Sequence, residues 1–273
     1  MVANTDNPSS CSFTAADLER IRNETAVLQI EYCLQVTSTN DHALQLAMQA
    51  GLQFPLLVLA ENQTAGRGRN TNQWWSHQGA LCFSLILETD TAELPPNLWP
   101  QASMTTGLAV CEALEKLLPT DEIRLKWPND VYVAHKKICG ILVESPRQDP
   151  KKLVLGIGIN VNNSCQAAPS DLADSMQSMS DVAKHPFLLT DVLVGVLRKL
   201  FERLNSIDKW DQELHAGWQK RCLLTDRSIR VKTIQKEIEG LCRGIDEQGA
   251  LLVQTAGNLE RCLSGTITLL DTD

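Results

Sequence analysis

The sequence predicts an α+β fold with a small antiparallel β-barrel appended at its C-terminal end. Apolar β-runs interleave with helical patterns up to residue 222, whereas from residue 223 only short β-runs remain, separated by turn signals. The chain has 273 residues, a length that suggests one large domain and one small one. We therefore expect an N-terminal tail and helix over residues 1–35, a main domain over 36–222 and a small domain over 223–273.

Capping signals and periodicity define the first elements. Thr14 precedes a short helical pattern with an acid in its first turn, and residues 27–36 are rich in β-forming side chains. Apolar residues then recur at helical spacing up to Gly51, which stands where the second helix should end. The residues that could cap this second helix are Ser38, Thr39 and Asn40.

A polar loop separates two buried strands. Residues 55–63 form an apolar strand that runs into the polar segment 64–79, and residues 80–88 form the next apolar strand. An amphipathic helical pattern follows over residues 99–118. The short β-runs after it are EIRLKW, VYVA, KICGILVES and LVLGIGINV.

The last part of the chain changes character. Residues 181–222 are mostly helical, with a second helix that runs through Trp210 and Trp218. Turn signals at 246–249 and 257–258 then punctuate closely spaced β-runs, a pattern typical of a small antiparallel barrel. The β-runs are SIRVKTI, KEIEGLCRGI, GALLVQT and ERCLSGTITLL.

Composition and charge argue against several classes of protein. The 25 basic and 33 acidic residues give a net charge of −8, which argues against bulk binding to nucleic acid. The nine cysteines include no C-x-x-C pair and the five histidines no H-x-x-x-H pair, so we expect no metal site built from short ligand pairs. The odd cysteine count indicates reduced thiols, and neither a long apolar stretch nor a signal-peptide pattern is present. We therefore expect a cytoplasmic protein that no membrane anchors.

The first segment that could carry chemistry is AGRGR at residues 65–69, in the polar loop. Its glycines let backbone N–H groups approach an anion, and its arginines supply planar forks that suit carboxylate or phosphate. Trp74 follows and offers an aromatic face for a flat ligand. An exposed basic turn or a fragment of an RNA-binding segment is the alternative, because this motif alone is weakly specific.

The second segment is KWPND at residues 126–130, followed by KICGILVE at 137–144. Gly140 stands among apolar residues, which indicates that something approaches the backbone closely there. Lys137 just before it could hold an acyl phosphate oxygen at the mouth of an apolar pocket. The alternative is a strand-end lysine that only extends its amine to solvent.

The third segment is GIGINVNN at residues 156–163. Two glycines weaken a strand, so they favour room for a ligand, to which Asn160 could form a hydrogen bond. The alternative is a β-bulge with a polar exit.

Together and in this order, AGRGRxxxxW, KWPND…KxxGILVE and GIGINV resemble the signature of the biotin protein ligases, also called biotin–[acetyl-CoA-carboxylase] ligases. The resemblance extends from about residue 36 to the C-terminus. It implies a mixed sheet with helices, as in class II synthetases and biotin/lipoate ligases, plus an SH3-like barrel. It also implies that biotin and ATP form biotinoyl-5′-AMP with Mg²⁺, and that a lysine of a biotin carboxyl carrier protein, such as an acetyl-CoA carboxylase subunit, then takes the biotinoyl group.

The resemblance assigns roles to matching positions. Arg69 would hold the α-phosphate, Lys137 would bridge this phosphate and the biotin carboxylate, and Asp130 would lie near the nucleotide and help to orient the carrier's lysine. Biotin would contact Ser38, Thr39, Asn40, Gln63, Gly66, Arg67, Gly68 and Gly140. The nucleotide would contact Trp74, Lys126, Asn129 and Asn160, and no side chain is assigned as a direct metal ligand, although Asn160 would lie near the metal.

The residue types fit this chemistry. Adenylation joins two anions, so neutralisation of charge by Arg69, Lys137 and Mg²⁺ should matter more than a general base. An apolar pocket edged by Ser, Thr and Gln suits biotin. The loop at 65–69 is expected to close over the ligands and to keep water from the mixed anhydride.

Three departures from the family pattern bear on function. Residues 70–74 read NTNQW where many members carry R-G-R-x-W, so the resemblance does not extend to a supplementary phosphate contact there, and Cys82 stands where an aromatic is common. About 36 residues precede the pattern, too few for the winged helix-turn-helix of bifunctional members, so we expect no DNA binding. A homodimer remains open. The alternative functions are a lipoate–protein ligase and a non-enzymatic RNA- or partner-binding module.

Overall fold

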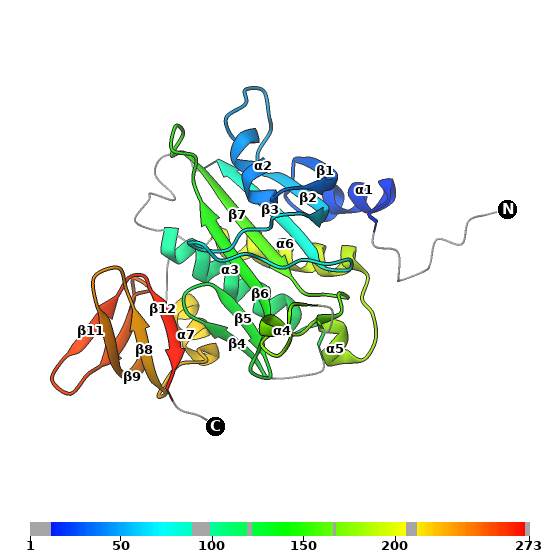
Figure 1. The fold of residues 1–273 in the computed structure, drawn as a ribbon. Helices are drawn as coiled ribbons and strands as arrows, with labels where there is room; N and C mark the ends of the chain where they lie inside the picture. The colour runs from blue at the N-terminus through cyan, green and yellow to red at the C-terminus, as the bar shows by residue number, and fades with distance from the viewer. Residues whose placement is uncertain (1–11, 89–98, 119–121, 166–167, 206–211, 271–273) are drawn as a thin grey trace.

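A seven-stranded mixed sheet forms the centre of the larger unit (Figure 1). The computed structural model describes the chain except residues 1–11, 89–98, 119–121, 166–167, 206–211 and 271–273. β1 and β2 are parallel, and the other neighbouring strands are antiparallel, as the α+β prediction with a mixed sheet requires. The strands in spatial order are β1 (Gln29–Val36), β2 (Leu56–Gln63), β3 (Leu81–Glu88), β7 (Lys152–Ile159), β6 (Lys136–Glu144), β5 (Asp130–Val133) and β4 (Ile123–Lys126).

The two faces of this sheet enter separate apolar clusters. The helices are α1 (Ala15–Glu24), α2 (Thr39–Leu46), α3 (Trp99–Leu114), α4 (Ser170–Ala173), α5 (Met179–Ala183), α6 (Leu189–Leu204) and α7 (Gln212–Arg221). Leu57 and Leu59 of β2 point into the large cluster with α1, α3 and α6, whereas Leu56 and Val58 pack against Ala43 of α2. Because α2 is short, it covers only part of the sheet face on which it packs. The candidate site lies on the same face, beside α2.

The predicted N-caps are confirmed, whereas the prediction that Gly51 ends the second helix is wrong, because α2 ends at Leu46 with Ala47 as its C-cap. Thr14 accepts a hydrogen bond from the backbone N–H of Asp17, and the Asp17 side chain accepts one in return from the backbone N–H of Thr14, which completes a capping box at the start of α1. Of the three candidates for α2, Ser38 is the N-cap, and its side chain accepts from the N–H of Asp41. This cap fixes the point at which the chain leaves β1 and begins α2.

The remaining elements agree with the predictions within a few residues. The helix predicted over 99–118 ends at Leu114, and the region 181–222 contains most of α5, then α6 and α7. The sequence gives no signal for α4, since four residues are too few for a periodic pattern. Trp210 lies outside the described residues. Within them, no helix is both long enough and apolar enough to cross a lipid bilayer.

A five-stranded antiparallel sheet forms the C-terminal unit, as predicted (Figure 1). Its strands in spatial order are β11 (Leu259–Cys262), β10 (Leu251–Gln254), β9 (Glu237–Ile245), β8 (Ser228–Lys232) and β12 (Thr266–Leu269). The expected boundary at residue 222 lies between α7 and β8. The division into domains stays a prediction, and β1, most of which lies ahead of the expected start at residue 36, already belongs to the large sheet.

The two units meet at the KWPND turn. The indole N–H of the buried Trp127 donates a hydrogen bond to the carbonyl of Gly249, in the turn that joins β9 and β10. A Cβ atom on Gly249 would lie 1.9 Å from the Met104 methyl group of α3, so this turn fits tightly against the larger unit. Leu223 also donates its backbone N–H to Leu125 of β4. The C-terminal unit therefore helps to hold the turn that carries Asn129 and Asp130.

We expect Trp127→Phe to lower the free energy of unfolding by about 1–2 kcal/mol, because the carbonyl of Gly249 loses its buried donor. Trp218→Phe is the matched control, since the indole N–H of Trp218 is buried and has no hydrogen-bond partner among the described residues. Urea denaturation of both variants measures the difference. Equal losses in the two variants would mean that the bond between the units contributes nothing.

Candidate functional site

The sheet register aligns small residues into a row across the face that α2 partly covers. Cys82 of β3 pairs with Gly158 of β7, Gly158 pairs with Gly140 of β6, and Gly140 pairs with Asp130 of β5. Because paired residues point to the same face, Gly140 and Gly158 form a flat area, here called the glycine floor. Burial raises the pKa of the Cys82 thiol to about 11, so this end of the row is neutral. At the opposite end of the row Asp130 pairs with Lys126 of β4, so this end is charged.

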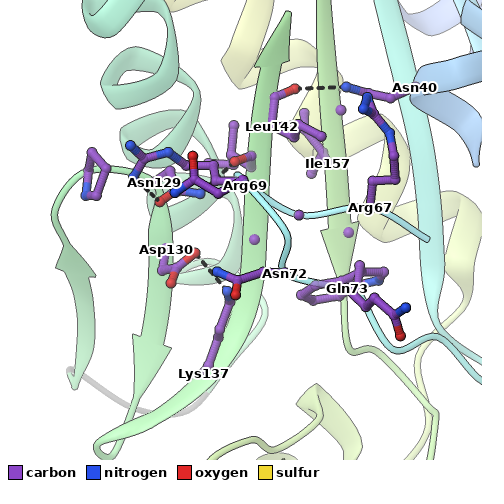
Figure 2. A pocket seen from close by; sticks show the side chains of 18 of the residues that line it. Asn40, Arg67, Arg69, Asn72, Gln73, Asn129, Asp130, Lys137, Leu142 and Ile157 are labelled. Carbon is purple, nitrogen blue, oxygen red and sulfur yellow. Dashed lines mark hydrogen bonds and ion pairs between the residues drawn. The ribbon is translucent and has the colours of Figure 1, made fainter. Parts of the chain in front are cut away.

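A cavity of about 160 Å³ lies over the glycine floor (Figure 2). It brings together side chains from β2, α2, the 65–69 loop, β4, β5, β6 and β7, which lie far apart in the sequence. The predicted site residues that line it are Ser38, Thr39, Asn40, Gln63, Arg67, Gly68, Arg69, Trp74, Lys126, Asn129, Asp130, Lys137 and Gly140. Two predicted residues, Gly66 and Asn160, are not in its lining.

One end of the cavity is a preformed hydrogen-bonding cluster. Ser84, fully buried in β3, donates to the side chain of Asn40 at 2.7 Å and lies 2.9 Å from the hydroxyl of Thr39. Gln63 accepts from the backbone N–H of Thr39 at 2.8 Å, and Asn40 donates to Glu144 at 3.0 Å. These bonds hold the polar groups in place before any ligand arrives. Ser84 is not among the predicted site residues, although it is the one polar residue inside the apolar run ALCFSLIL.

The glycines of β6 and β7 provide close approach, as predicted, but the groups that approach are side chains of this chain. A Cβ on Gly156 would lie 1.9 Å from the side-chain amide oxygen of Asn40, and one on Gly158 would lie 2.4 Å from the Trp74 ring. At Gly140 the Trp74 ring is 3.0 Å from the same position. Trp74 thus lies directly on the glycine floor, and Asn40 lies against β7.

We expect Gly156→Ala to cost about 1–3 kcal/mol of folding stability, because the new methyl group displaces Asn40 from its hydrogen bonds. Gly195→Ala is the control: nothing lies within 4 Å of a Cβ at this helical position, and alanine favours a helix. Denaturant midpoints should fall for the first variant and rise slightly for the second. An unchanged midpoint for Gly156→Ala would show that Asn40 is not held at β7.

The cationic end of the cavity depends on a β-bulge. The pairing of β5 with β6 slips by one residue between Val131 and Tyr132, which leaves Ile138 without an opposite partner. With regular alternation, the side chain of Lys137 would point to the face opposite to the glycine floor. The extra residue of the bulge restores Lys137 to the same face as the glycine floor. The amine of Lys137 then lies 2.7 Å from the carboxylate of Asp130 (Figure 2).

The two arginines of the loop differ in their partners. Arg67 forms ion pairs with Asp41 at the start of α2 and with Glu144 at the end of β6, so it fastens the loop to the sheet. Arg69 forms no ion pair with any described residue, and its one polar contact is with the side-chain oxygen of Asn129 at 3.5 Å (Figure 2). Burial lowers the pKa of Arg69, and the nearby charge of Asp130 opposes this effect only in part. It is the arginine that an incoming anion would stabilise.

Positive charge exceeds negative charge at this end. Arg69, Lys126 and Lys137 surround Asp130, which among the described lining residues is the single carboxylate. Burial lowers the pKa of Lys126, Asp130 opposes this effect, and the neighbouring charge of Lys137 adds to it. Three cations around one carboxylate attract an anionic ligand, and the low local dielectric strengthens this attraction.

Gly66 and Asn160 have other surroundings. A Cβ on Gly66 would lie 2.6 Å from the carbonyl oxygen of Trp74, and the N–H of Trp74 donates to Gly66, so this glycine closes the base of the loop. Asn160 is fully buried outside the lining of the cavity, and its side-chain oxygen accepts a hydrogen bond from Asn163 at 3.0 Å. Its contact with a nucleotide stays a prediction. The stretch 265–267, at the start of β12, does line the cavity, and the local sequence contains no signal for this.

Comparisons with known proteins agree with this arrangement. The model of the biotin/lipoate A/B protein ligase family matches residues 32–162, and the model of the biotin protein ligase C-terminal domain matches residues 226–270. Fold and site therefore define a ligase built from a catalytic unit and a small C-terminal unit. More narrowly, the chain belongs to the biotin protein ligase family.

Individual relatives give the same result. The bifunctional ligase/repressor BirA of Bacillus spizizenii is 30% identical over 240 residues, which cover 86% of this chain and 72% of the relative. The biotin–[acetyl-CoA-carboxylase] ligase of Mycobacterium tuberculosis is 29% identical, with 89% of each chain covered. The structure of the biotin protein ligase from Aquifex aeolicus in complex with biotin and ATP superposes with a TM-score of 0.77, at 28% identity over 90% of this chain and all of that one.

Proposed function

We propose that this chain activates biotin with ATP and transfers the biotinoyl group to a lysine of a biotin carboxyl carrier protein. One observation supports this most strongly: a hydrogen-bonding cluster and an excess of cations stand at opposite ends of one glycine-floored cavity. Biotin has the matching ends, a ureido ring that forms hydrogen bonds and a carboxylate, joined by an apolar body. Its carboxylate would meet the α-phosphate of ATP at the cationic end.

In the first half-reaction a carboxylate oxygen of biotin attacks the α-phosphorus. A C–O–P linkage forms, the bond between the α- and β-phosphates breaks, and pyrophosphate leaves with the electron pair. The ureido end is held by Ser38, Thr39, Asn40 and Gln63, while Arg69 and Lys137 neutralise the two anions that must approach each other. No general base is needed, because the carboxylate is already ionised.

In the second half-reaction the carrier's lysine, as a neutral amine, attacks the acyl carbon of the mixed anhydride. The new C–N bond replaces the C–O bond to phosphate, AMP leaves, and the proton of the amine passes to solvent. Asp130 is the cavity carboxylate that can accept a hydrogen bond from this amine and orient it. Its ion pair with Lys137, the residue proposed to bridge the biotin carboxylate and the α-phosphate, supports this role.

The nucleotide and its metal ion are proposed to lie at the cationic end, against Trp74, Lys126 and Asn129. Because Asp130 is the single lining carboxylate and already pairs with Lys137, the described side chains offer few oxygen ligands to Mg²⁺. Magnesium keeps several waters and binds readily to phosphates, so it would arrive on ATP and neutralise phosphate charge there.

The setting of the reaction is part of this proposal. The cysteines that the structure describes are free thiols, which supports a reducing compartment such as the cytoplasm. The carrier protein is the proposed macromolecular partner. A homodimer and the lack of DNA binding stay predictions, which sedimentation and a DNA-binding titration can test.

The decisive experiment supplies the chain with MgATP and either biotin or lipoate, measures pyrophosphate, and then adds a carrier domain. Pyrophosphate should be released from ATP with biotin but not with lipoate, and the mass of the carrier should then rise by one biotinoyl group. Activity with lipoate in place of biotin would indicate a lipoate ligase. RNA binding without pyrophosphate release from either acid would indicate a binding module.

A further inference from the structure

Glu31, Cys33 and His42 meet at the edge of the large sheet, outside the cavity. Glu31 and Cys33 are two residues apart on β1, so their side chains point to the same face. The register pairs them with Val58 and Ala60 of β2, and Val58 packs against α2. His42 lies on α2 and extends its ring toward the same two side chains.

The geometry of these three groups is that of a ligand set. A carboxylate oxygen, the thiol sulfur and an imidazole nitrogen all lie within 4.8 Å of one another. The His42 Nε2 atom is 3.6 Å from the Glu31 carboxylate. This nitrogen is shielded from solvent and forms no hydrogen bond with the residues that the structure describes, since the Glu31 carboxylate is too distant for one. Such an atom is costly unless something binds it.

We propose that Glu31, Cys33 and His42 bind a transition-metal cation of the Zn²⁺ type. Thiolate, imidazole and carboxylate are the three side-chain ligands of zinc, and a water molecule can take the fourth tetrahedral position because all three residues are partly exposed. Magnesium and calcium prefer sets made of oxygen alone and are poor candidates. The site is separate from the ligase chemistry and goes beyond it.

Charge balance favours a divalent cation here. Coordination replaces the thiol proton of Cys33 with the metal, and the proton passes to solvent. The thiolate and the Glu31 carboxylate then carry two negative charges, which match the charge of a divalent cation.

These three ligands do not form a short ligand pair such as C-x-x-C. Two of them alternate along strand β1 and the third comes from helix α2, so the local sequence contains no marker of the site. The bound metal would tie edge strand β1 to α2. Since α2 also carries Asn40, the site adjoins the hydrogen-bonding end of the cavity.

The test is a titration of the reduced, metal-free full chain with Co²⁺, without biotin or ATP. We expect a near-ultraviolet thiolate-to-cobalt charge-transfer band that saturates at one equivalent and disappears when Zn²⁺ is added. Cys33→Ser should abolish the band, and His42→Gln should weaken cobalt binding by at least about tenfold. Glu31→Gln, at a more exposed position, provides a further variant if either of these fails to fold.

Cys222→Ser is the matched control. The thiols of Cys222 and Cys242 contact each other and could also bind cobalt, so the band must survive this substitution if the proposed site is responsible. Absence of the band from the wild-type chain, its survival in Cys33→Ser or its loss in Cys222→Ser would each overturn the proposal. Biotin-dependent pyrophosphate release should persist in Glu31→Gln, which separates failure of this site from failure of the proposed function.

Discussion

Arg69→Ala is expected to reduce biotin-dependent pyrophosphate exchange by on the order of 100- to 1000-fold while leaving the melting temperature within a few degrees of the wild type. The guanidinium has no carboxylate partner among the described residues, and burial lowers its pKa. Its positive charge is therefore weakly compensated in the empty site, and an ion pair with the phosphate of ATP would stabilise it. Because it contributes little to the fold, its removal should cost rate rather than stability.

Arg67→Ala is the matched control in the same loop. Arg67 already forms ion pairs with Asp41 and Glu144, so its loss should free the loop and raise the KM for biotin more than it lowers kcat. Exchange assays and thermal melts of both variants distinguish the two roles. A large drop in melting temperature for Arg69→Ala, with exchange retained, would mean that Arg69 is structural.

The sequence predicts the fold well where the signals are local. Thr14 and Ser38 are residue types that cap helices, and the structure uses both as caps. The apolar runs at 55–63 and 80–88 become β2 and β3 because strands buried on both faces are apolar throughout. The sequence does not predict α4, or the contact between Trp127 and the Gly249 turn, which depends on residues far apart in the chain.

The composition of the site is also predictable, whereas its connections are not. Each of the three motifs contributes to the cavity, since their residue types suit an anionic ligand and a close backbone approach. Arg67 rather than Arg69 forms ion pairs because the fold brings Asp41 of α2 and Glu144 of β6 to it, and no local sequence signal predicts this. The direction of Lys137 depends on a single unpaired residue in β6, for which the sequence contains no marker.

Lys137→Ala should reduce adenylate formation by on the order of 100-fold or more while weakening biotin binding by less than about tenfold. Its amine lies 2.7 Å from Asp130, and without it the carboxylate of Asp130 faces the incoming biotin carboxylate and phosphate directly. The bonds among Ser84, Asn40 and Thr39 at the other end of the cavity remain, so most of the affinity for the ureido ring should persist.

A double variant separates lost catalysis from new repulsion. Lys137→Ala combined with Asp130→Ala removes both partners of the ion pair, so biotin affinity should recover toward the wild-type value while adenylation stays slow. Calorimetric biotin titration and single-turnover formation of biotinoyl-5′-AMP measure the two quantities separately. If Lys137→Ala formed the adenylate at the wild-type rate, or if the double variant recovered that rate, the amine would serve only to neutralise Asp130. In that case Arg69 and the metal ion on ATP would have to supply all of the charge stabilisation at the α-phosphate.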